Sequence, residues 1–107
     1  MIIFEALSKL EKKIRLTAFQ WAHMRFKHPE LSSQENKMIE TLKNPDLIYH
    51  SPQEENFQYL KLFGQTPLGE KYLLLIVKHL NGEGFIITGF FVSKIKTKDK
   101  VLIWKRK

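Results

Sequence analysis

The stretch LTAFQWAHMRFKHPEL, residues 16–31, brings His23 and His28 close to Arg25 and Lys27. Cleavage of RNA without a metal ion needs a base for the 2′-hydroxyl proton, an acid for the leaving 5′-oxygen and cations for the phosphate. Histidine titrates near neutral pH, and lysine or arginine supplies the positive charge. These residue types therefore predict acid–base chemistry on a phosphodiester, while their spacing leaves open which histidine is the base.

The spacing of the two histidines does not favour a metal site. Residues five apart on a helix lie about 140° from each other, whereas the histidines of a zinc-protease helix are four apart. The other candidate ligands are scattered, and the chain contains no cysteine. We therefore expect no metal ion and no cofactor. Each histidine also has a structural explanation, since His23 could pack beside Trp21 and Met24, and His28 could cap the helix end.

Length and composition set the broad class of the protein. The chain has 107 residues, 43% of them hydrophobic, which predicts a single domain over residues 1–107. The longest apolar stretches, YLLLIV and FIITGFFV, are much shorter than a membrane span, and the N-terminal stretch lacks the basic region of a signal peptide. We expect a cytoplasmic protein that makes no contact with a membrane.

The formal net charge of +7 is unevenly distributed. Residues 59–107 contain ten lysine or arginine residues against three acidic ones, whereas residues 32–58 contain two against five. General solubility is one explanation for the basic excess. The other is a polyanionic partner, because lysines on a sheet neutralise phosphates and release counterions. RNA is the partner predicted by this second explanation, and its backbone would contact Lys61, Lys78 and Lys96.

The helix that carries the histidines has clear predicted ends. Thr17 and Gln20 form a capping box, so the helix should begin at Ala18. It should end close to His28, because the residue before Pro29 is disfavoured in a helix.

A second capping box, Ser32 with Glu35, predicts another helix that stops near Asn44. The segment before the first helix is ambiguous, because apolar residues recur there at helical spacing while KIRLT, residues 13–17, alternates like a strand. For residues 1–17 we expect a helix or an irregular lead-in followed by a short extended piece.

After Pro45 the hydrophobic pattern takes the period of strands. Five apolar runs are separated by turn-forming segments, and they cover residues 46–51, 56–63, 70–80, 84–95 and 101–104. The NGEG segment between the third and fourth runs predicts a tight hairpin. The expected fold class is α+β, with two N-terminal helices followed by a four- to five-stranded antiparallel sheet.

Strand alternation assigns side chains to the two faces of this sheet. In the third run one face carries Leu73, Leu75 and Val77. In the fourth run one face carries Ile86, Thr88, Phe90, Val92 and Lys94. Neither face is simply polar, so we expect the helices on one side and the N-terminal segment or a partner chain over part of the other.

Several motifs follow one another in a characteristic order: Trp-x-His with His-Pro-Glu, the TLKNPD helix end, the IITGFF strand followed by KIK, and a final IW. In this order the chain resembles the small barnase, EndoU, colicin and RelE-like ribonuclease superfamily. The similar branch occurs in phage polyproteins and in free-standing cyanobacterial and other bacterial proteins. The resemblance runs from about residue 14 to residue 104.

The resemblance implies two N-terminal helices, a four-stranded antiparallel sheet, and a metal-independent ribonuclease or toxin-like role with an acidic antitoxin or immunity partner. His23 and His28 fall on the helix histidines of the family, Thr88 on its strand hydroxyl and Lys94 on its basic residue after that strand. Lys27 stands where the family usually has arginine. A lysine balances charge but does not clamp a phosphate through two hydrogen bonds.

These observations predict a metal-independent endoribonuclease of toxin type. His23 and His28 would be the acid and base, Thr88 would hold a phosphate oxygen or orient a histidine, and Lys27 and Lys94 would stabilise charge. The alternative is a non-catalytic nucleic-acid or protein binding module on the same fold, which does not need the histidines. In the ribonuclease interpretation, the acidic stretch of residues 32–58 could contact the basic sheet of a second copy in place of an acidic partner protein. A structural or oligomerisation domain is a third interpretation, which a large apolar dimer interface across the outer face of the sheet would favour.

Overall fold

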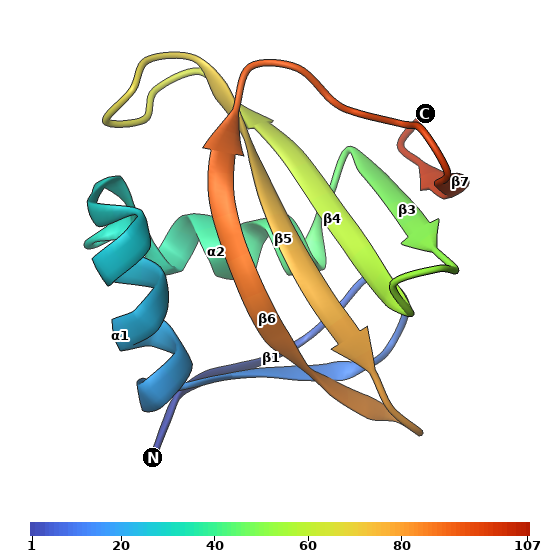
Figure 1. Cartoon of the computed structure of the whole chain (residues 1–107), viewed down its shortest axis with the longest axis horizontal. Helices are drawn as coiled ribbons and strands as arrows, with labels where there is room; N and C mark the ends of the chain where they lie inside the picture. Colours follow the sequence, from blue (N-terminus) through green and yellow to red (C-terminus); the bar gives the residue numbers. More distant parts are fainter.

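The computed structural model describes all 107 residues as a seven-stranded sheet with two helices packed against it (Figure 1). The elements in chain order are β1 (Ile2–Leu7), β2 (Lys13–Thr17), α1 (Ala18–Lys27), the short 3₁₀ helix η1 (Pro29–Leu31), α2 (Glu35–Lys43), β3 (Leu47–Ser51), β4 (Asn56–Phe63), β5 (Lys71–His79), β6 (Glu83–Val92) and β7 (Val101–Lys105). The strand order in the sheet is β1-β2-β6-β5-β4-β3-β7.

The α+β class is confirmed, but the helices do not come first. Residues 2–7, expected as a helix or an irregular lead-in, form β1, which pairs antiparallel with β2. The expected extended piece at residues 13–17 is confirmed as β2. Because β2 also pairs in parallel with β6, the sheet is mixed rather than purely antiparallel. Burial in the first strand follows the period of a strand, since Ala6 and Ser8 are buried while Glu5 and Leu7 are exposed.

The five strands expected after Pro45 are all present, and they form the antiparallel part of the sheet in the order β6-β5-β4-β3-β7. The hairpin at NGEG is also confirmed. Gly82 adopts the left-handed conformation at φ +78°, and the Leu80 N–H donates a hydrogen bond of 2.6 Å to the Glu83 carbonyl. The fourth run is shorter than expected, because β6 ends at Val92.

The start of α1 is confirmed, and its capping explains how the helix meets the sheet. The Thr17 hydroxyl accepts a hydrogen bond of 3.2 Å from the backbone N–H of Gln20. The Gln20 side chain does not complete the capping box. It donates instead to the backbone carbonyl of Ile87, so it ties the first turn of α1 to β6.

The predicted start of the second helix is wrong. The N-cap of α2 is Gln34, with no hydrogen bond from its side chain, and the Ser32 capping box is not formed. Pro29–Leu31 turn immediately into η1, and Leu31 is fully buried, which places Ser32 in the connecting turn. The predicted end is correct, since Asn44 is the C-cap.

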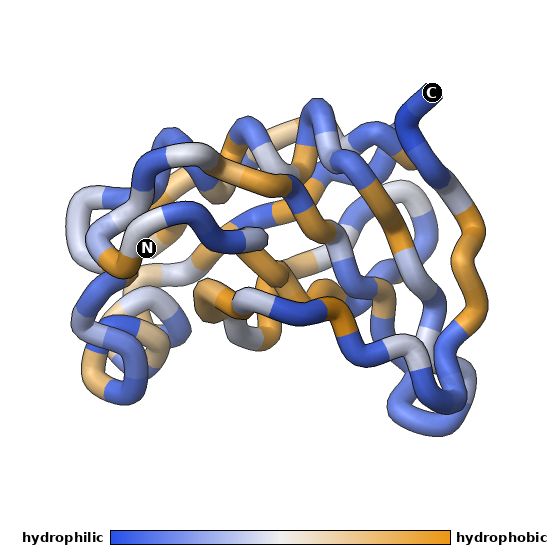
Figure 2. The backbone as a smooth tube through the Cα atoms, turned by 90° about the horizontal axis from the view of Figure 1, so that it is seen from above, coloured by the Kyte–Doolittle hydropathy of each residue, from blue (hydrophilic) through white to orange (hydrophobic).

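The hydrophobic core lies between the sheet and the helices. Its helical contributors are Trp21, Met24, Met38 and Leu42. The sheet contributes Ala6, Ile14, Leu16, Ile48, Tyr59, Leu73, Leu75, Val77, Ile86 and Phe91. Hydrophobic stretches of the chain cross the middle of the molecule, while most loops at the rim are hydrophilic (Figure 2). The N-terminal strands therefore extend the sheet and join the core on the helix side, and they do not cover the opposite face.

A bulge between β5 and β6 decides which side chains reach that opposite, open face. The partner of Ile76 is Thr88, and the partner of the next residue, Val77, is Ile86. Ile87 is therefore an extra residue in β6, and the alternation shifts by one. Ile86 is 1% exposed in the core, so the prediction that it shares a face with Thr88 is wrong. Leu73, Leu75 and Val77 share the core face as expected.

No helix of the protein has both the length and the apolar character needed to cross a membrane.

Candidate functional site

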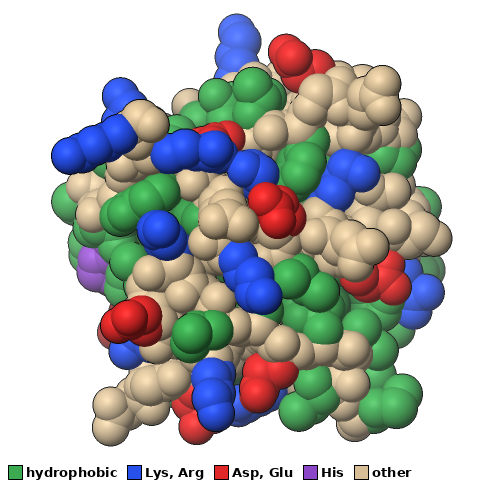
Figure 3. Space-filling model, turned by 180° about the vertical axis from the view of Figure 1, so that it is seen from behind, with side chains coloured by type: hydrophobic (Ala, Val, Ile, Leu, Met, Phe, Trp, Pro, Cys, Tyr) green, Lys and Arg blue, Asp and Glu red, His purple; other side chains and the backbone are tan.

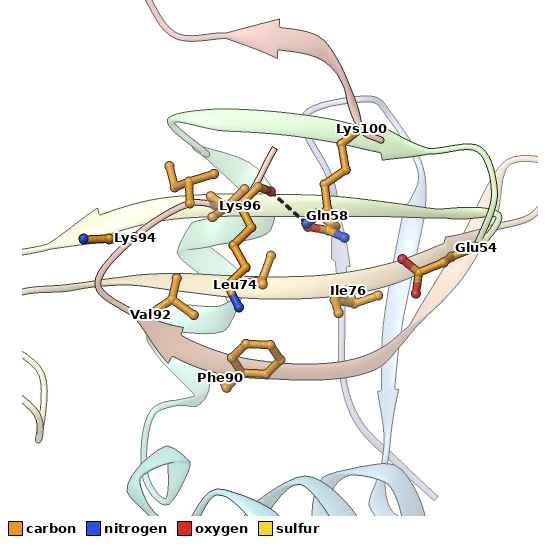
Figure 4. Close-up of a pocket in the computed structure, with 11 residues that line it drawn as sticks. Glu54, Gln58, Leu74, Ile76, Phe90, Val92, Lys94, Lys96 and Lys100 are labelled. Carbon is orange, nitrogen blue, oxygen red and sulfur yellow. Dashed lines mark hydrogen bonds between the residues drawn. The ribbon is translucent and has the colours of Figure 1, made fainter. Parts of the chain in front are cut away.

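The open face of the sheet carries a groove with a cavity of about 270 Å³. Its floor is made by apolar side chains of β4, β5 and β6, which are Leu60, Leu74, Ile76, Phe90 and Val92. One side is formed by the segment that follows β6, which contributes Lys94, Ile95, Lys96 and Lys100 (Figure 4). The groove thus combines an apolar floor with a basic rim.

Lys100 holds the side segment against the sheet. Its ammonium group donates hydrogen bonds of 2.9 Å to the Gln58 side-chain oxygen and 2.9 Å to the Lys96 carbonyl. Gln58 is only 4% exposed, so this contact anchors the segment to β4. Two hydrogen bonds leave Lys100 well ordered, with a positive charge at the groove.

The remaining charged groups are arranged along the groove. The Lys96 side chain extends across the floor toward Phe90, while Lys94 points outward at one end and Glu54 stands at the other (Figure 4). Three ammonium groups against one carboxylate give the site a net positive charge. An anion with an apolar or aromatic part fits this combination, because the floor can bury the ring while the lysines meet the charge.

His28 lies beside the groove. Its ring centroid is 5.3 Å from that of Phe90, with the rings inclined at 31°, and its Nδ1 is 3.8 Å from a carboxylate oxygen of Glu30. Thr88 precedes Phe90 by two residues on the same open face of β6 and is partly buried. Of the residues predicted for catalysis, the structure therefore brings His28, Thr88 and Lys94 to one side of the sheet.

His23 and Lys27 do not join this group, and both are exposed on α1. Trp21 and Met24 are buried and mark the side of α1 that faces the sheet. At about 100° per residue, His23 lies roughly 200° from Trp21 and 100° from Met24, which turns it toward solvent. His23 and His28 therefore lie on different surfaces of the protein.

The three lysines predicted to bind RNA are also separated. Lys96 lines the groove. Lys78 is on the open face but lies 3.5 Å from the carboxylate of Glu55. Lys61 pairs across the strands with Leu73, a core residue, so its side chain leaves the sheet on the helix side.

A second polar cluster was missed by sequence reasoning. The hydroxyl of Tyr59 lies 2.9 Å from Oγ of Ser8 and 3.0 Å from Nε2 of His79. The Phe57 ring stacks between His50 and His79, with centroid distances of 4.5 and 3.8 Å. Strand alternation could have indicated this cluster, because Tyr59 and His79 occupy core-facing positions of their strands.

This cluster holds the hairpin between β1 and β2 against the sheet. Burial raises the pKa of Tyr59 to about 12, although the hydrogen bond to Ser8 acts in the opposite direction. Burial also lowers the pKa of His79 to about 4, and the positive charges of Lys12 and His50 add to this effect. Because Tyr59 and Ser8 are buried, the network serves stability rather than access for a ligand.

The shifted pKa of His79 predicts a loss of stability in acid. In the unfolded chain the His79 imidazole becomes protonated as the pH falls below about 6.5, whereas in the folded protein it becomes protonated only near pH 4. As the pH falls through this window, we expect the free energy of unfolding to fall by about 1–2 kcal/mol. The full pKa shift would give a larger loss, but water screens the partly exposed side chain. Urea unfolding at several pH values measures this.

His79→Gln should flatten the pH dependence in this window, whereas His23→Gln, on the solvent side of α1, should leave it as in the wild type. An unchanged slope in the His79 variant would contradict the assignment.

The structure contains no group of three or more histidine, cysteine, aspartate or glutamate side chains placed to hold a metal ion. A scan against protein-family models, a search of curated proteins and a search of solved structures each found no match. The chemistry of the groove is therefore argued from its own residues.

Proposed function

We propose that this protein binds single-stranded RNA across the open face of its sheet. The observation that carries the proposal is the groove itself, in which Phe90 lies on the floor and the ammonium group of Lys96 extends toward it (Figure 4). Aromatic side chains stack on unpaired bases while lysines follow the backbone, which is the usual arrangement for single-stranded nucleic acid. The resemblance to small ribonucleases supports RNA as the ligand.

The distribution of charge supports this face over the rear of the molecule. Seen from behind, lysine and arginine side chains are interspersed with acidic ones over the helix side (Figure 3). The groove instead places Lys94, Lys96 and Lys100 around one apolar floor, with Glu54 alone at its end. A concentrated set of cations attracts a polyanion more strongly than a mixed surface does.

Substituting Phe90 tests the binding role. Phe90→Leu keeps an apolar side chain on the floor but removes the stacking ring, so we expect single-stranded RNA to bind about tenfold more weakly. Fluorescence anisotropy with a short labelled RNA measures the affinity. Phe26→Leu, which removes an exposed ring from α1, is the matched control and should bind like the wild type. Equal affinities for wild type and Phe90→Leu would refute the stacking site.

Cleavage of the bound RNA is a second candidate function, favoured by the position of His28 next to Phe90. His28 would take the proton from the 2′-hydroxyl, whose oxygen attacks the phosphorus and expels the 5′-oxygen, giving a 2′,3′-cyclic phosphate. Lys94 would stabilise the phosphate charge, Thr88 would hold a non-bridging oxygen, and water or a lysine would protonate the leaving oxygen. His23 has no part in this scheme, because it faces solvent.

Incubation with RNA in the presence of a chelator tests cleavage. If the candidate is correct, the wild type yields 2′,3′-cyclic phosphate ends, His28→Ala loses at least about 100-fold in rate, and His23→Ala remains active. Cleavage that survives His28→Ala would rule out this site. No cleavage by the wild type, with RNA binding intact, would leave binding as the function.

A further inference from the structure

Helix α1 has a second apolar face that nothing in the protein covers. Phe19 is 82% exposed and Phe26 is 85% exposed, although both are large aromatic residues. They are seven positions apart in the sequence, so they lie in line on the helix surface, directly opposite the side that Trp21 and Met24 bury against the sheet. Exposure of two aromatic side chains on one face of a helix is unfavourable in water, and an exposed apolar patch typically marks an interaction site.

The residues between the two rings complete a recognisable packing surface. Phe19, Ala22, His23 and Phe26 occupy positions i, i+3, i+4 and i+7, the four positions that form a hole for a side chain of a neighbouring helix. The two phenylalanines are about 10 Å apart along the axis. The small side chain of Ala22 leaves space between them, so the face is shaped to receive a helix.

The charge of α1 identifies the kind of helix that fits. The sequence of α1, AFQWAHMRFK, contains no acidic residue. By helical spacing Arg25 and Lys27 lie on either side of the apolar face, and the Arg25 guanidinium lies 5.0 Å from the centroid of the Trp21 ring. A second copy of this chain packed through the same face would bring these cations together, which is unfavourable. Carboxylates on the facing helix would pair with them.

We propose that the outer face of α1 docks an acidic amphipathic helix of another protein. Apolar residues of that helix would enter the hole between Phe19 and Phe26, and its flanking carboxylates would meet Arg25 and Lys27. His28 and the groove lie on the sheet side of α1, so a docked helix leaves the groove accessible. The proposal does not depend on RNA binding, and it assigns His23 to the docking surface on α1.

A defined peptide probe tests this. The probe is a helical peptide of about three heptads with leucine at the packing positions and glutamate at the flanking ones. We expect it to bind the full chain at least about tenfold more tightly than the same peptide with lysine in place of glutamate. The double variant F19S/F26S should lose at least about tenfold in affinity for the glutamate peptide.

The control variant is Leu68→Ser, which removes an exposed apolar side chain from a loop and should bind like the wild type. Circular dichroism should show that F19S/F26S is folded, since both positions are exposed. Equal binding of the two peptides, or equal binding by wild type and F19S/F26S, would overturn the proposal. So would phenylalanine-dependent binding to vesicles containing about 30% phosphatidylserine, or phenylalanine-dependent self-association, if the glutamate peptide does not bind.

Discussion

Replacing Gly84 with alanine is expected to lower the free energy of unfolding by about 3 kcal/mol or more. A Cβ atom at this position would lie 2.2 Å from the carbonyl oxygen of Lys78 and 2.9 Å from Cδ1 of Ile14. The first of these is a backbone atom of the paired strand β5 and cannot rotate away. The strands would have to separate where β2, β6 and β5 meet, since Gly84 pairs with both Ile14 and His79.

Thermal and denaturant unfolding measure this effect, and a loss of this size corresponds to a melting temperature lower by roughly 15 °C. Gly64→Ala is the matched control, because a Cβ there meets nothing within 4 Å, and it should change stability little. A Gly84→Ala protein within about 0.5 kcal/mol of the wild type would show that the three strands do not approach so closely.

Gly84 is also a residue whose role could not be predicted from the sequence. The NGEG segment correctly predicts the hairpin, and Gly82 supplies the left-handed residue that the turn requires. Gly84 has a different role, which is to let Ile14 of β2 approach β6. That approach joins segments about seventy positions apart, and no local pattern around residues 81–84 indicates it.

The N-terminal strands illustrate the same limit. The apolar side chains within residues 1–14 recur at helical spacing, yet this part of the chain forms strands. It does so because β2 pairs with β6. The pairing is supported by an ion pair of 2.6 Å between Arg15 and Glu83. Partner strands outweigh local preference in a sheet. By contrast, the start of α1 and the end of α2 depend on neighbouring residues such as Thr17 and Asn44, and both were predicted correctly.

The candidate site was predicted only in part. The sequence prediction joined His23 and His28 in one catalytic site, but the structure places them on different surfaces, because His23 is exposed on α1 whereas His28, the C-cap residue, lies beside Phe90. Lys94 and Lys96 were selected from the sequence after β6, and both line the groove. Lys100 was missed because its role depends on the segment after β6 folding back until it reaches Gln58.

Removing the three groove charges should have the largest effect on RNA binding. In the variant K94E/K96E/K100Q, we expect the affinity for single-stranded RNA at low salt to fall by about 100-fold or more. The logarithmic dependence of affinity on salt should also become shallower by about 2, since each lost phosphate contact removes about 0.7 from the slope for a single strand. Glutamine at position 100 keeps a side chain that can hydrogen-bond to Gln58, so the side segment stays in place.

A control with equal loss of positive charge separates this local effect from overall charge. Lys13, Lys27 and Lys43 are all exposed and lie outside the groove. Changing two of them to glutamate and one to glutamine removes as much positive charge from the whole molecule. If net charge alone attracts RNA, the two triple variants will lose affinity equally and the groove is not the binding site. If the groove binds RNA, only K94E/K96E/K100Q will lose both the affinity and the steep salt dependence, because counterions are released only where phosphates meet lysines.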